Sequence, residues 1–110
     1  MPKFWVDGHT SVYLDKRHTD REIFEEIARE MGDLAELWYM QGELVMLGIN
    51  ALRILENKRE DLIGKILGIL GRRYDTRRFE EELRKRVEKA RSILGVGPLG
   101  REGGKEVLGP

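Results

Sequence analysis

The sequence predicts an all-α fold: a four-helix bundle-like domain, residues 1–94, with a short N-terminal β-hairpin and a flexible C-terminal tail, residues 95–110. Three observations lead to this prediction. Apolar residues recur at helical spacing through most of residues 20–94. Capping signals precede those runs. The last sixteen residues hold six of the thirteen glycines and two of the three prolines, a composition typical of flexible chain.

The first expected element is the hairpin, at about residues 3–14. β-branched and aromatic residues stand on both sides of Asp7-Gly8, a pair that favours the positive φ angles of a two-residue turn. Because so short a ribbon is marginal by itself, we expect it to lie on the helices or to pair with another copy.

Four helices are expected, at about residues 20–31, 34–56, 60–71 and 77–94. Thr19 and Glu22 have the spacing of a capping box at the start of the first helix, and Gly32 suits its end. Gly64 and Gly68 fall away from the apolar stripe of the third helix, where each costs roughly 1 kcal/mol against alanine. Either another backbone approaches closely there, or the helix simply tolerates them.

The expected helix 34–56 is the unusual element. Apolar residues cover most of its circumference, which is typical of a central helix buried on more than one side. One narrow polar line is left, made of Glu36, Glu43 and Asn50 at intervals of seven residues. Three interpretations stay open for this line: it faces solvent, it pairs with Arg86 of the last helix, or it forms a ligand site.

The composition excludes several classes of site. Twenty basic and twenty acidic side chains give a formal charge of zero, so no bulk attraction to nucleic acid or membrane is expected. The chain has no cysteine, which excludes disulfides and thiolate zinc sites. It shows neither a signal peptide pattern nor a long apolar run, so we expect an intracellular, cytoplasmic protein without a membrane span. Abundant charge with one glutamine and two asparagines resembles thermophile composition.

Charge is nevertheless uneven along the chain. Residues 19–43 carry eight acids and two bases, whereas residues 71–91 carry nine bases and five acids. A cluster in the basic half surrounds an aromatic residue and comprises Arg72, Arg73, Tyr74, Arg77 and Arg78. Such a cluster is a candidate contact for an anion or a nucleic-acid backbone. The alternative is that it bridges to the acidic half.

The leading functional hypothesis is a non-enzymatic helical interaction protein that acts in assembly or regulation. The expected central helix has more apolar surface than its neighbours can cover, so we expect a homodimer or higher oligomer, with another protein as an open possibility. Candidate interface residues are Trp5, Trp38, Tyr39, Met40 and Leu47. A nucleic-acid-binding regulator that uses the arginine cluster is the first alternative. No cofactor is expected under either hypothesis.

A second alternative is an enzyme. The stretches "IAREMGDLAELW" and "GELVMLGINALRILENKREDLIGKILGILGRRY" resemble MazG-type all-α nucleoside triphosphate pyrophosphohydrolases, in which an ExxE helix and an ExxD helix bind magnesium. The resemblance implies magnesium ligands at Glu30, Asp33 and Glu43. It departs from the family pattern at Met46, which stands where the ExxD aspartate belongs.

Overall fold

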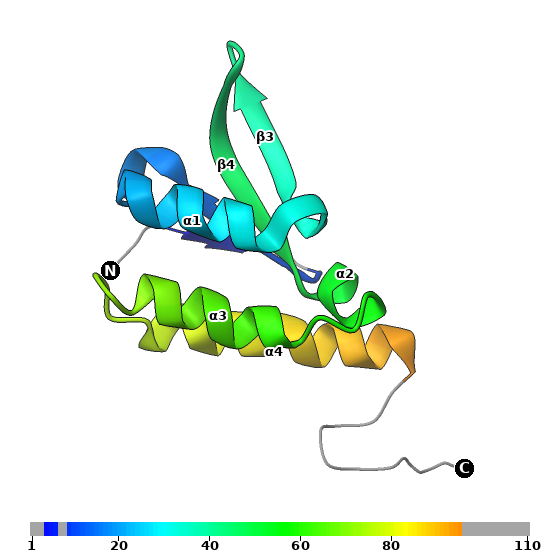
Figure 1. Ribbon diagram of the computed structural model, residues 1–110. Coiled ribbons are helices and arrows are strands. Elements are labelled where there is room, and N and C mark those ends of the chain that lie inside the picture. The colour runs from blue at the N-terminus through cyan, green and yellow to red at the C-terminus, as the bar shows by residue number, and fades with distance from the viewer. Residues whose placement is uncertain (1–3, 7–8, 96–110) are drawn as a thin grey trace.

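The computed structural model describes residues 4–6 and 9–95, and it shows a mixed α/β fold (Figure 1). Four antiparallel strands form one sheet in the order β1-β2-β4-β3, so β1 and β3 are its edges. The expected all-α bundle is therefore wrong. The strands and helices, in chain order, are β1 (Phe4–Val6), β2 (Ser11–Asp15), α1 (Arg21–Met31), β3 (Glu36–Met40), β4 (Glu43–Asn50), α2 (Ala51–Glu56), α3 (Asp61–Leu70) and α4 (Arg77–Leu94).

The expected central helix 34–56 does not exist; its place is taken by the hairpin of β3 and β4, followed by the short helix α2. Gln41 and Gly42 both have positive φ angles, 54° and 82°, which is the backbone of a tight two-residue hairpin turn. Because nearly every position of this stretch is apolar, its pattern fits a helix buried all round and a strand buried on both faces equally well. The bulky residues of β3 favour the strand.

The N-terminal hairpin is present, with a different connection from the one expected. β1 ends at Val6 and β2 begins at Ser11, so four residues separate the two strands where a two-residue turn was expected. Asp7 and Gly8, the predicted turn, lie outside the described residues, and so do residues 96–110 of the predicted tail.

Three helices start and end close to the residues predicted for them, at Arg21–Met31, Asp61–Leu70 and Arg77–Leu94. The first is capped by Asp20, one residue after the expected Thr19, because the Asp20 carboxylate accepts hydrogen bonds from the N–H groups of Glu22 and Ile23 at 2.9 and 3.2 Å. A positive φ of 54° at Gly32 ends this helix. None of the described helices is both long and apolar enough to cross a membrane.

The core lies between one face of the sheet and the helices. Val12 is opposite Ile49, and Leu14 is opposite Leu47, so these four fully buried side chains share one face. They join a cluster contributed by the helices: Ile23, Phe24, Ile27, Met31, Ile54, Leu62, Ile66, Ile69, Leu70, Phe79 and Leu83. The opposite face of the sheet is not part of this core, and it carries the features described next.

Candidate interaction surface

The edge strand β3 presents an apolar strip, made of Leu37, Trp38, Tyr39 and Met40. Their exposed fractions are 44, 57, 60 and 59%, respectively. Successive strand residues point to opposite faces, so this strip exposes large apolar side chains on both sides of the hairpin. The end of the β3–β4 hairpin rises beyond the helices, which explains why neither side is covered (Figure 1).

A β-bulge interrupts the β3–β4 pairing near the turn of the hairpin. Trp38 pairs with Met46 and Tyr39 pairs with Leu44, so Val45 is an extra residue on β4. The bulge changes the alternation of β4, and Leu44 therefore turns toward the core, where it packs against the buried cluster. Since the extra residue belongs to β4, β3 itself keeps a regular edge from Glu36 to Met40.

On the face of the sheet away from the core, one row crosses all four strands: Trp5, Tyr13, Gly48 and Glu36 stand opposite one another in turn. A Cβ atom at Gly48 would lie 2.7 Å from Cε1 of Tyr13 and 2.8 Å from Cβ of Glu36. The Tyr13 and Glu36 side chains can therefore pack this closely only because residue 48 is a glycine. The Trp38 ring meets the Tyr13 ring edge to face, at 6.2 Å between centroids. This contact orients the base of the apolar strip.

The polar residues of the predicted line have structural partners. The carboxylate of Glu36 accepts hydrogen bonds from the Tyr13 hydroxyl at 3.1 Å and from the Asn50 amide at 3.0 Å. Asn50 in turn accepts from the Thr10 hydroxyl at 2.8 Å and caps α2 by accepting from the Leu52 N–H at 2.9 Å. These bonds tie β2, β3, β4 and α2 together at one corner of the sheet.

The third residue of the line, Glu43, lies at the start of β4 and forms an ion pair with Lys16 at 3.1 Å. The pairing of Arg86 with Glu43 that the sequence left open is not what the structure shows. Arg86 forms an ion pair with Glu82, one turn away on α4, at 3.2 Å. Since β-strands replace the helix, residues 36, 43 and 50 no longer form one line.

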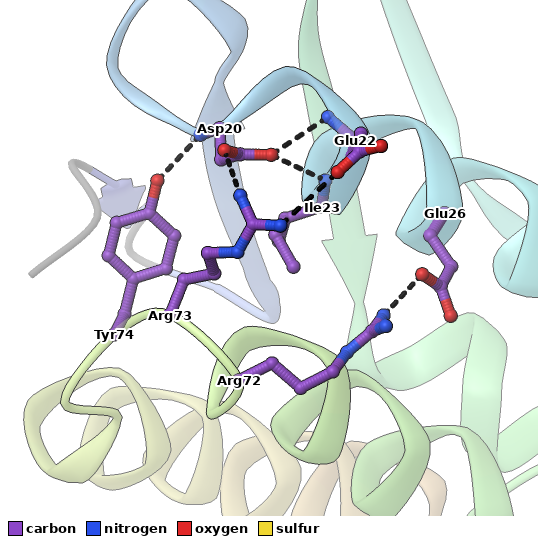
Figure 2. Close-up of polar contacts among 7 residues, drawn as sticks. All are labelled: Asp20, Glu22, Ile23, Glu26, Arg72, Arg73 and Tyr74. Atoms are coloured by element: carbon purple, nitrogen blue, oxygen red, sulfur yellow. Dashed lines mark hydrogen bonds and ion pairs between the residues drawn. The ribbon is translucent and has the colours of Figure 1, made fainter.

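The arginine cluster tethers the α3–α4 connection to α1 (Figure 2). Arg73 forms ion pairs with Asp20 at 2.5 Å and with Glu22 at 3.2 Å, and Arg72 pairs with Glu26. Tyr74 accepts a hydrogen bond through its hydroxyl from the backbone N–H of Asp20 at 2.6 Å. The acidic and basic halves of the sequence therefore meet within one chain at this point.

Little unpaired positive charge is left in the cluster. A hollow of about 360 Å³ beside Arg72 and Arg73 is lined by as many carboxylates as guanidinium groups: Glu22, Glu25, Glu26, Arg29, Arg72 and Arg73, together with Ile23. Arg77 holds Asp75 by paired hydrogen bonds and lowers the pKa of that carboxyl to about 2. Arg78 is exposed, and within residues 4–6 and 9–95 it has no ion-pair partner.

The three acids of the magnesium hypothesis lie on different elements. Glu30 is near the end of α1, where it pairs with Lys65 at 3.7 Å, and Asp33 is in the turn after that helix. Glu43, which the resemblance places on a second acidic helix, is on strand β4 instead. In the part of the chain that the structure describes, no three acidic or histidine side chains are grouped as a metal site would require.

Four of the predicted interface residues, Trp5, Trp38, Tyr39 and Met40, lie at the surface on the edge strands β1 and β3, whereas Leu47 is fully buried in the core. The sequence did not single out Tyr13 or Gly48. Tyr13 packs against Trp38 of the apolar strip, and Gly48 leaves room for the Tyr13 and Glu36 side chains. The alternation of Val12, Tyr13 and Leu14 was the available signal for Tyr13, whereas the role of Gly48 depends on a contact between strands distant in sequence.

Comparisons of the chain with protein families, with curated proteins and with solved structures found no match.

Proposed function

We propose that this protein is a non-enzymatic interaction protein that acts in assembly, and that it docks onto another protein chain through the β3–β4 hairpin. The observation that carries the proposal is the apolar strip: four consecutive large side chains, all more than two fifths exposed, on an edge strand. Contiguous exposed apolar surface of this kind marks interaction sites in proteins.

The strip has the composition of an interface centre. Tryptophan, tyrosine and methionine are enriched at such centres, and charged residues are depleted there. The strip contains no charged residue, and the carboxylate of neighbouring Glu36 already accepts two hydrogen bonds. The Tyr13–Trp38 contact restrains the central ring before a partner arrives, which reduces the entropy lost on binding.

The two alternatives have less support. For nucleic-acid binding through the arginine cluster, Arg72, Arg73 and Arg77 would have to leave the carboxylates that they contact. For magnesium-dependent hydrolysis, Glu43 would have to join Glu30 and Asp33 from a strand that pairs elsewhere in the fold. Docking through the apolar strip requires no such rearrangement.

Site-specific photocrosslinking tests the proposal in cells that produce the full chain. Benzoylphenylalanine replaces Tyr39 in one variant and Glu88, which is exposed on α4, in the matched control. We expect a discrete crosslinked protein, identified by mass spectrometry, from position 39 and none from position 88. Adding Met40→Lys to the position 39 variant should abolish the adduct. Equal crosslinking at both positions, or none at position 39, would contradict the proposed function.

A further inference from the structure

The outer edge of β3 lacks the features that usually prevent strand pairing. Its five residues include no lysine, arginine or proline, and its single charge, on Glu36, is turned to Tyr13 and Asn50. The bulge lies on β4, so it does not interrupt the free edge of β3. A regular, mostly apolar edge whose one charged side chain is bonded within its own sheet is a template for one more antiparallel strand.

The chain itself can supply that strand. We infer that two copies pair through β3 in antiparallel orientation, so that their two sheets become one continuous sheet of eight strands; this inference rests on the proposed function and names its partner. A two-fold axis relates the copies, as in most homodimers. The pairing that engages all five residues, Glu36 to Met40, is the one centred on Trp38.

In this register the side chains match. Trp38 stands opposite Trp38 of the second copy, Leu37 stands opposite Tyr39, and Glu36 stands opposite Met40. No two like charges face each other directly. Both apolar sides of the hairpin continue across the axis, so each copy covers strip residues of the other that its own helices leave exposed.

The exposed area is sufficient to begin such an interface. With roughly 200 Å² for a large side chain, the exposed fractions of the apolar strip amount to roughly 440 Å² on each copy. Stable complexes bury about 800 Å² per partner, so the strip provides about half. The backbone edge of β3, which the two copies would share, can supply more.

Cysteine crosslinking of the purified full chain tests the register, because the natural sequence contains no cysteine. In the proposed dimer, the two Cys residues of Trp38→Cys are directly opposite, within the Cα separation of about 4.4–6.8 Å that a disulfide needs. The matched control is Met40→Cys, on the same strand and the same face. Its two copies would be about 13 Å apart along the strands. Mild oxidation should link most of the first variant and little of the second.

Light scattering of the unmodified chain accompanies this test, and a dimer is expected. If Trp38→Cys weakens association, an equal mixture of Leu37→Cys and Tyr39→Cys chains should form the mixed disulfide, and neither chain alone should do so. A dimer that links equally well through position 40 would overturn the register. A monomer would overturn self-pairing, while a crosslink from position 39 to a different protein would still support the proposed function.

Discussion

Gly48 shows how a single residue determines the packing of the side chains next to the apolar strip. The Tyr13 ring and the Glu36 side chain close over it, and the Glu36 carboxylate is held there by Tyr13 and Asn50. Because Cβ of Glu36 is fixed to its backbone, only a shift of β3 relative to β4 would make room for a larger residue. The position of β3 relative to β4 thus depends on the absence of a side chain at Gly48.

Gly48→Ala is therefore expected to lower the free energy of unfolding by about 1–3 kcal/mol, the usual cost of overpacking. The matched control is Gly64→Ala on α3, where an added Cβ would meet no atom within 4 Å. That substitution should stabilise the protein by about 0.5–1 kcal/mol, because alanine favours helix. Urea denaturation measures both values. Equal effects of the two substitutions would show that Gly48 is not tightly enclosed.

Among the elements, the connection between α3 and α4 is tied to the start of α1. Tyr74 reaches the Asp20 backbone, and Arg73 reaches the Asp20 side chain that caps the helix (Figure 2). One aspartate thus caps α1 and binds the connection at the same time. Exposed ion pairs such as these contribute only about 0–1 kcal/mol each, so the hydrogen bond of Tyr74 is the firmer link.

Tyr74→Phe keeps the aromatic ring and removes only the acceptor of the Asp20 N–H. We expect the free energy of unfolding to fall by about 0.5–1.5 kcal/mol, measured by urea denaturation. Arg78→Ala serves as the control, since Arg78 is exposed in the same region, and it should change stability by less than about 0.5 kcal/mol. If Arg78→Ala lowers the free energy of unfolding more than Tyr74→Phe does, the hydrogen bond of Tyr74 is not the main link between the α3–α4 connection and α1.

At the scale of the whole molecule, the helices cover one face of the sheet and leave the β3–β4 hairpin uncovered (Figure 1). Side chains that the fold leaves exposed on the hairpin would be buried in the proposed dimer. Folding and association are then linked, because the native dimer dissociates when its chains unfold. Stability should consequently depend on protein concentration.

Thermal unfolding at two protein concentrations measures this linkage. A tenfold increase should stabilise the native dimer by about 1.4 kcal/mol, which raises the unfolding midpoint by about 3–5 °C. Trp38→Lys places two like charges opposite each other at the proposed axis, so its midpoint should not change with concentration. Should the unmodified chain behave like Trp38→Lys, the protein unfolds as a monomer and self-pairing is wrong.

Residues of the candidate surface could be predicted from sequence where residue type alone marks them, and not where their exposure depends on contacts with distant segments. Trp38, Tyr39 and Met40 stand out by residue type alone, and the structure places all three at the surface. Leu47, of the same apolar character, was predicted to lie in the interface and is buried. Nothing within a few residues of Leu47 distinguishes it, because its burial comes from its position opposite Leu14 on β2.

The positions of α1, α3 and α4 could be predicted from local sequence, since helical hydrogen bonds and apolar periodicity join residues only three or four positions apart. That residues 36–50 form strands depends on contacts with the rest of the fold. Strand hydrogen bonds join distant segments, and β4 pairs with β2, more than thirty residues earlier in the chain. An almost continuously apolar stretch satisfies a buried helix or a strand equally well, so the available neighbours decided between them.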